Sequence, residues 1–236
     1  MVVIPQLSIL KYNHVERYME MEIIWFGHSC FKLNEKGLAT VITDPYDAQT
    51  TGHTPLNSSA EIVTISHNKP GHNFVDTIKG NPFVISVPGE YEIGSVFITG
   101  LQTDGQSAKV EPANRNTMYI FDFDGIKIAH LGGVNHLPVQ SEVEELGNVH
   151  ILLVPIGGTS TLNAVQAAEI VNLIEPNIVI PMHYMTESSI IMLDPLNKFL
   201  KEMGVSNVEP LNSFKITSLR NLPEETQVVV LEVMNN

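Results

Sequence analysis

The sequence predicts an α/β fold that contains a large proportion of β-sheet. Short apolar runs recur along the chain and are bounded by Gly, Pro, Asn and Asp, as strands usually are. Helical patterns come mostly in the second half, where they alternate with strand patterns. No repeat, low-complexity segment or linker divides the sequence. Together these observations indicate one α/β domain.

The expected domain begins at Met21, with the strand-like run MEIIWFGHSCFKL, and extends to residue 236. Residues 1–20 are expected to form an N-terminal extension. The pair Asp124-Gly125 separates two apolar runs and predicts a β-hairpin. Further strands are expected, in chain order, at residues 39–43, 61–66, 83–87, 96–100, 117–123, 126–131, 150–156, 177–183 and 226–233.

Three segments are expected to form helices, at residues 139–147, 161–175 and 193–204. The second has apolar residues three and four apart, with Thr161 as its expected N-cap and Pro176 just beyond its end. In the third, Asp194 is the expected cap and Pro195 occupies the first turn.

Composition limits the classes of function. The net charge is −13, from 26 acidic and 13 basic residues, and no basic stripe occurs, so nucleic-acid binding is not expected. No stretch approaches the ~20 apolar residues of a membrane span, and the N-terminus lacks the basic region of a signal peptide. A single cysteine, Cys30, excludes an intrachain disulfide and fits a cytoplasmic protein.

Histidines stand at the ends of three expected strands. His67 follows the run EIVTIS, His130 closes IKIA and His183 closes NIVIPM, while His72 lies one short loop after His67. Ligand sites in α/β folds lie beyond the carboxyl ends of strands, so these side chains can converge. One such histidine alone is more often structural, but the four together indicate a site for zinc, manganese or iron.

Two further residues have open interpretations. Asp44 ends a strand ahead of Pro45, where it could hold a metal-binding histidine in one tautomer or simply form a turn. His28, in the sequence GHS, could face the cleft or be an ordinary turn residue.

Seven segments in order carry a resemblance to a known family: WFGHSCFKL, ITDPY, TISHNKPGH, VPGEYEIGSVFITG, IAHLGG, VPIGGTSTLNA and VIPMHY. Together they resemble the metallo-β-lactamase superfamily, and most closely its branch of metal-dependent hydrolases that includes ascorbate-6-phosphate lactonase-like proteins. The resemblance runs from about residue 21 to near the C-terminus. It implies a four-layer αββα sandwich with two metal sites along one edge.

The resemblance also implies a set of metal ligands. TISHNKPGH stands at the place of the superfamily's HxHxDH motif, so His67 matches its first histidine and His72 its last. His130 in IAHLGG and His183 in PMHY match the later histidines of the family.

At three positions the chain departs from the family. Lys69 stands at the second histidine of the motif and Gly71 at its aspartate. Gly133 stands at the aspartate that usually bridges both metals. At ~4 Å, two like unit charges cost ~4 kcal/mol at an effective dielectric of 20, and a divalent ion doubles this. Without the carboxylates, and with an added ammonium, at most one zinc or manganese ion per chain is expected.

Two functions follow from this pattern. The first is a metal-dependent hydrolase that acts on an ester, lactone or phosphoester of an anionic small molecule. The second is a catalytically inactive member, metal-free or not, that binds an anionic small molecule near Lys69 or serves as a scaffold subunit. The resemblance is also compatible with a homo-oligomer.

Overall fold

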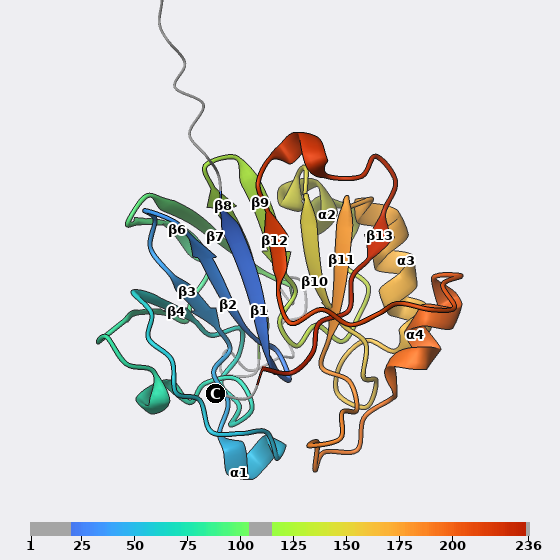
Figure 1. The fold of residues 1–236 in the computed structure, drawn as a ribbon, viewed down its shortest axis with the longest axis horizontal. Helices are drawn as coiled ribbons and strands as arrows, with labels where there is room; N and C mark the ends of the chain where they lie inside the picture. The colour runs from blue at the N-terminus through green and yellow to red at the C-terminus, as the bar shows by residue number, and fades with distance from the viewer. Residues whose placement is uncertain (1–19, 104–114, 235–236) are drawn as a thin grey trace, which may run out of the picture.

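The computed structural model describes residues 20–103 and 115–234, which form two β-sheets packed face to face (Figure 1). The first sheet has the order β12-β1-β2-β3-β4-β5, and the second has the order β13-β11-β10-β9-β8-β7-β6. The first comprises β1 (Met21–Gly27), β2 (Cys30–Glu35), β3 (Val41–Thr43), β4 (Ile62–Thr64), β5 (Phe83–Ile85) and β12 (Phe214–Ile216). The second comprises β6 (Gly89–Ile93), β7 (Val96–Gln102), β8 (Thr117–Phe123), β9 (Ile126–His130), β10 (Ile151–Pro155), β11 (Ile178–Met182) and β13 (Gln227–Val228).

Each sheet contains a parallel part. In the first sheet β3, β4 and β5 run parallel, and in the second β9, β10, β11 and β13 run parallel. The other strand pairs named above are antiparallel. Because the carboxyl ends of parallel strands meet at one edge of a sheet, residues that follow them are brought close together.

The main core lies between the two sheets. Trp25 and Phe31 from the first sheet and Tyr119 and Phe121 from the second are all at most 1% exposed. Burial of each such side chain contributes about 1.5–3 kcal/mol. Strand residues alternate between faces, so a second, smaller apolar cluster that includes Ile42 lies on the outer face of the first sheet.

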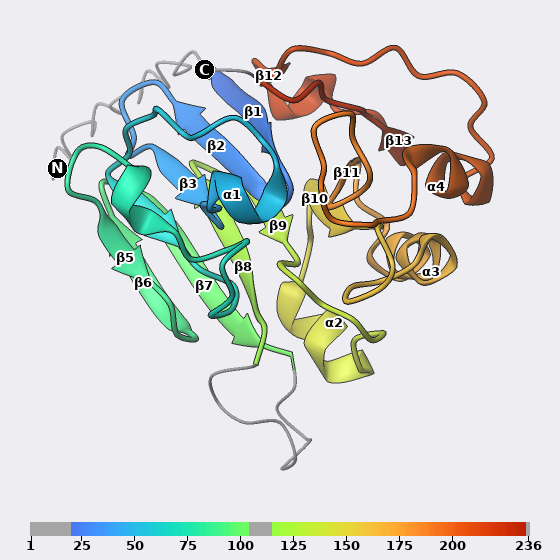
Figure 2. The same ribbon diagram turned by 90° about the horizontal axis from the view of Figure 1, so that it is seen from below.

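Helices occupy the outside of the sandwich. They are α1 (Ala48–Thr51), α2 (Gln140–Leu146), α3 (Ala164–Ile174) and α4 (Leu196–Glu202), with short 3₁₀ helices η1 (Val75–Thr77) and η3 (Leu219–Asn221). Figure 2 shows α2, α3 and α4 together beside β10 and β11, while α1 lies on the side of β1–β3. The segment around α1 and η1 contributes Tyr46, Leu56 and Ile78 to the smaller cluster. The expected α/β sandwich is confirmed.

The predicted elements mostly form where the patterns placed them. The three expected helices are α2, α3 and α4, and the Asp124-Gly125 hairpin joins β8 to β9 with both residues at positive φ. Strands β6 and β12 were not predicted, and the run from Met21 divides into β1 and β2 around His28. The run 226–233 forms only the two-residue strand β13, because the chain then leaves the sheet and Leu231 pairs with Leu211 instead.

Two predicted helix caps were wrong. The N-cap of α3 is Asn163, whose side chain accepts a hydrogen bond from Gln166 N, whereas Thr161 N–H and hydroxyl both donate to Gly158 O in the preceding turn. The α4 helix is capped by Pro195. Asp194 instead forms an ion pair with Lys198 at 2.6 Å.

The N-terminal extension falls almost entirely outside the described residues, which begin at Glu20, so the division at Met21 stays a prediction. Within residues 20–103 and 115–234, no helix has the length and apolar character that a membrane crossing requires.

Candidate metal centre

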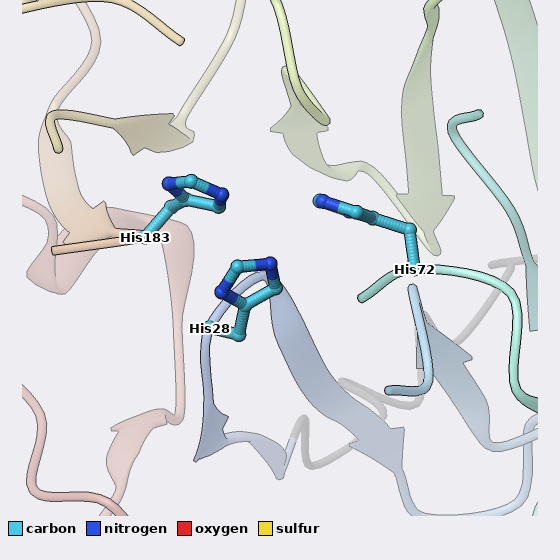
Figure 3. Close-up of side chains that lie close together, drawn as sticks. All are labelled: His28, His72 and His183. Atoms are coloured by element: carbon cyan, nitrogen blue, oxygen red, sulfur yellow. The ribbon is translucent and has the colours of Figure 1, made fainter. Parts of the chain in front are cut away.

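Four buried histidine rings meet beyond the strand ends, and we call His28, His67, His72 and His183 the histidine cluster. His28 lies in the turn between β1 and β2, His67 and His72 follow β4, and His183 follows β11. Ring centroids are 3.9 Å apart for His67–His72, 4.1 Å for His28–His183 and 4.8 Å for His28–His72. Figure 3 shows the rings of His28, His72 and His183 converging from separate segments.

The backbone around these rings is strained. His28 has φ 52°, His183 has φ 53° and Asp44 has φ 39°, all in the left-handed region that non-glycine residues rarely adopt. Such residues cost about 1–3 kcal/mol each and gather at functional sites. The carbonyl of His28 compensates in part, since it accepts hydrogen bonds from His183 N at 2.9 Å and from Trp25 Nε1 at 3.1 Å. The bond from His183 connects the two sheets at the site.

A buried carboxylate orients two of the rings. Asp44 Oδ2 accepts hydrogen bonds from His72 Nδ1 at 2.8 Å and from the Ser66 hydroxyl at 2.5 Å, and Oδ1 accepts from Ser66 N at 2.7 Å. The Ser66 hydroxyl donates its only proton to Asp44, so its oxygen accepts a hydrogen bond from His67 Nδ1 at 2.9 Å. His67 and His72 therefore both carry their proton on Nδ1 and present a lone pair on Nε2.

The rings of the cluster are held neutral. Burial lowers the pKa of His67 and of His183 to about 4, and it lowers the pKa of His28 and of His72 well below the ordinary value of 6.5. Other rings of the cluster lower the pKa of His28, His67 and His72 further, because like charges repel. Burial raises the pKa of Asp44, although its hydrogen bonds from Ser66 oppose this shift. Neutral imidazole is the form that binds a metal.

His130 lies outside the cluster, although the sequence placed it among the ligands. It is fully buried at the end of β9, and its Nε2–H donates to Ser29 O at 2.9 Å. Its Nδ1 accepts from Gly132 N at 3.2 Å. A neutral imidazole has one donor and one acceptor, so both are used within the protein.

The three positions that the sequence predicts to depart from the family motif, Lys69, Gly71 and Gly133, surround the cluster. Lys69 is exposed and lines, with His28, His67, His72 and His183, a cavity of about 230 Å³. Its charge contributes to the lowered pKa of His67, behind burial. A Cβ atom at Gly71 would lie 2.7 Å from His28 Nε2, and one at Gly133 would lie 2.4 Å from His67 Cε1.

The residues present fit one divalent ion. The donor atoms of His28, His72 and His183 all lie within 4.8 Å of one another, and so do those of Asp44, His67 and His72. In the first group His183 Nδ1 is buried, and the described part of the chain offers it no hydrogen-bond partner. An unsatisfied buried nitrogen is costly unless something binds it. In the second group both oxygens of Asp44 already accept hydrogen bonds.

A family profile described as β-lactamase superfamily domain matches residues 22–183, more than half of the chain. This chain belongs to that superfamily. A UPF0173 protein of Pyrococcus furiosus is 27% identical over 231 residues, which cover 83% of this chain and 100% of the relative. A UPF0173 metal-dependent hydrolase of Nanoarchaeum equitans is 30% identical over 213 residues, covering 80% and 95%.

A solved structure is similar as well. The crystal structure of a Thermotoga maritima protein of the metallo-β-lactamase superfamily has a TM-score of 0.73 and 36% sequence identity, and it covers 91% of this chain and 100% of that one. The narrower resemblance to ascorbate-6-phosphate lactonase-like proteins stays a prediction, as does the loss of the family's second metal.

A larger cavity adjoins the histidine cluster of this superfamily member. It measures about 520 Å³ and shares the His67 side chain with the smaller cavity. Polar side chains line it, among them Asn68, Asn73, Gln102 and Arg115. Ile65, Val87 and Pro88 also line this cavity, which lies directly beside the candidate metal centre.

Sequence reasoning missed two residues of this region. Ser66 joins Asp44 to His67, and its only signal in the sequence is that it directly precedes His67. Arg115 lines the larger cavity, but no pattern in the sequence connects it with the histidines, because the fold alone brings it there.

Proposed function

We propose that this protein is a hydrolase that depends on a single divalent ion held in the histidine cluster. Its substrate would be an ester, a lactone or a phosphoester that carries negative charge. One observation carries the proposal: His183 Nδ1 has no hydrogen-bond partner among the described residues. It lies within a buried set of neutral imidazoles. The Nanoarchaeum equitans relative is named as a metal-dependent hydrolase, and the Thermotoga maritima neighbour is described as a candidate zinc-dependent hydrolase.

The ligand atoms favour zinc over manganese. Imidazole nitrogens are suited to zinc, whereas manganese prefers carboxylate and water oxygens. Asp44, the carboxylate nearest the rings, has both oxygens engaged in hydrogen bonds. A divalent ion in this place supplies Lewis acidity, which polarises the carbonyl or phosphoryl group of a substrate.

The side chains around the centre have separate parts in the reaction. Asp44 and Ser66 hold the rings of His72 and His67 in one tautomer, so no proton needs to move before the centre can act. His67 lies between the two cavities and positions the reacting group of the substrate. Arg115 in the larger cavity binds the anionic part of the substrate, since guanidinium pairs well with carboxylate and phosphate.

The acidic balance of the chain gives this pocket a further role. The protein carries a net charge of −13, so an anionic substrate is repelled by most of its surface. Lys69 on the smaller cavity and Arg115 on the larger one provide local positive charge on the path to the centre. A bound divalent ion adds to this attraction.

The first experiment measures metal content together with turnover. Protein stripped with a chelator is exposed separately to zinc and to manganese, desalted, and analysed by elemental mass spectrometry. About one ion per chain is expected, and the loaded protein should hydrolyse members of a panel of esters, lactones and phosphodiesters. His150→Ala, at a half-buried histidine outside the cluster, serves as the control and should retain the ion.

Other outcomes lead to different conclusions. Two ions per chain would contradict the single-ion centre. One ion without turnover on the whole panel would favour the alternative function, a non-catalytic protein that binds an anionic molecule or acts as a scaffold subunit.

A further inference from the structure

We infer that Gly71 admits His28 as the third ligand of the ion, so that the centre is a site of three histidines: His28, His72 and His183. This inference rests on the proposed metal dependence and names the residues that bind the ion. The sequence left open whether His28 faces the cleft or is an ordinary turn residue.

The three rings meet the geometric needs of one ion. Their donor atoms lie within 4.8 Å of one another, and Figure 3 shows the rings directed toward a common space. Each residue is at most 4% exposed. They come from the β1–β2 turn, the loop after β4 and the end of β11, so the ion would join both sheets. Three imidazoles with one open position are an established ligand set for catalytic zinc.

Space for His28 explains the glycine at position 71. A Cβ atom there would lie 2.7 Å from His28 Nε2, closer than real Cβ atoms approach, and 3.2 Å from its Cδ2, which is a tight contact. Gly71 is not among the glycines with a positive φ, so its backbone conformation does not itself require glycine. What requires glycine is the imidazole ring that fills the place of a side chain.

Gly133 provides a matched case, because it lies against the ring of His67. Its Cβ would lie 2.4 Å from His67 Cε1, and it too is absent from the positive-φ glycines. Each of these two glycines, which stand where the family has aspartates, therefore faces a histidine ring at close range. The difference between them is that His28 belongs to the donor group with the unpartnered nitrogen, whereas His67 does not.

The ring of His28 cannot make a small shift to accommodate a side chain at position 71. Its carbonyl is held by hydrogen bonds from His183 N and Trp25 Nε1, and its ring packs against His72 and His183. A larger residue at position 71 must therefore push the ring out of the donor group. The position of His28 in the centre and the identity of residue 71 are thus coupled.

The ligand set has a consequence for binding. Three neutral imidazoles leave both positive charges of a divalent ion uncompensated, whereas a carboxylate ligand would cancel one. The centre should therefore bind its ion less tightly and take an anion, such as inorganic phosphate, at the open position. The substrate class follows from this charge: it presents an anionic oxygen to the ion.

The test uses the metals alone as probes. Zinc affinity and stoichiometry are measured by isothermal titration calorimetry, and cobalt(II) in place of zinc reports coordination through its visible absorption spectrum. His28→Ala and Gly71→Ala should each weaken zinc binding about 10-fold or more and change the cobalt spectrum. Gly133→Ala and His67→Ala should retain one ion per chain with the wild-type spectrum.

A double-mutant cycle separates displacement of the ring from general damage. If Gly71→Ala acts by displacing His28, then adding it to His28→Ala should cause no further loss of zinc affinity. Melting temperatures of the metal-free variants confirm folding. If Gly71→Ala does not fold, X-ray absorption at the zinc edge of the unaltered protein counts the imidazole ligands, and three are expected.

The results that overturn the inference are distinct from those that overturn the proposed function. Wild-type zinc affinity in His28→Ala, or loss of the ion in His67→Ala, would assign the ion to the group of Asp44, His67 and His72. An ion bound by the three histidines in a protein without turnover would leave this inference intact and remove only the hydrolase.

Discussion

Two donor groups share His72, and they differ in what their atoms already do. In the group with His28 and His183, a buried nitrogen of His183 lacks a partner among the described residues. In the group with Asp44 and His67, hydrogen bonds through Ser66 engage the carboxylate and one nitrogen of His67. Similar residue types at similar distances therefore differ in their surroundings: the first group keeps an unpartnered nitrogen, and in the second group hydrogen bonds hold the rings of His67 and His72 in one orientation.

The largest effect is expected from removing the shared residue. His72→Ala takes a ligand from the first group and the hydrogen bond donor at 2.8 Å from buried Asp44 in the second. Bound metal should fall from about one ion per chain to almost none, and the metal-free protein should lose about 1–3 kcal/mol of stability, since buried Asp44 loses one hydrogen bond and keeps only those from Ser66. Elemental analysis and urea unfolding measure the two effects. A variant that keeps its ion would place the centre elsewhere.

Acid is expected to destabilise the metal-free protein, because each of the two donor groups contains a histidine with a lowered pKa. The pKa of His67 and of His183 is about 4 in the folded chain, against an ordinary 6.5 when unfolded. The unfolded chain therefore binds more protons below pH 6.5, so the stability from these neutral rings is complete above that pH and is lost as the pH falls toward 4. The urea midpoint at pH 7.5, 6 and 5 should decrease in that order. A constant midpoint would contradict the neutral rings.

A smaller and more selective effect is expected from Ser66→Ala. This change removes the hydroxyl that links Asp44 Oδ2 to His67 Nδ1, but leaves the bond from His72 to Asp44 in place. Metal content should stay near one ion per chain, while turnover should fall about 10-fold, because His67 loses the partner that sets its tautomer. Elemental analysis and steady-state kinetics on the same preparation separate the two. Loss of the ion would mean that the second group binds it.

The smallest effect is expected outside both groups, at Arg115 in the larger cavity. Arg115→Ala should weaken binding of inorganic phosphate to the zinc-loaded protein about 3-fold, with unchanged metal content, since a charged contact in a solvent-accessible cavity is lost. Arg115→Lys should retain part of the affinity. Titration calorimetry with phosphate measures both, and equal affinity in all three proteins would remove Arg115 from the anion site.

Much of the fold and part of the site could be predicted from local patterns. The hairpin at Asp124-Gly125 and the three helices depend on residues near in sequence, and they formed as expected. His67 and His183 each follow a buried parallel strand, so a place for each at a sheet edge could be expected. Their strands β4 and β11 belong to different sheets, however, and only the packing of the two sheets brings the side chains together. The cap of α3 differed by two residues because Thr161 bonds to Gly158 O in the preceding turn and leaves the cap to Asn163. The cap of α4 differed by one residue, and Asp194 pairs with Lys198 instead.

By itself the sequence determined most of the strands and helices in order, the superfamily, and a set of histidines at strand ends beside Lys69, Gly71 and Gly133. Only the tertiary structure decided which of these imidazoles lie together and which already have hydrogen-bond partners within the protein. His130 Nε2 donates a hydrogen bond to the carbonyl of Ser29, 101 positions away in the chain. The ring of His28 lies in the cluster, where the absence of a side chain at Gly71 leaves space for it. The reason is physical: a ring nitrogen is a ligand or a structural donor according to the atoms that pack against it, and those atoms come from distant segments.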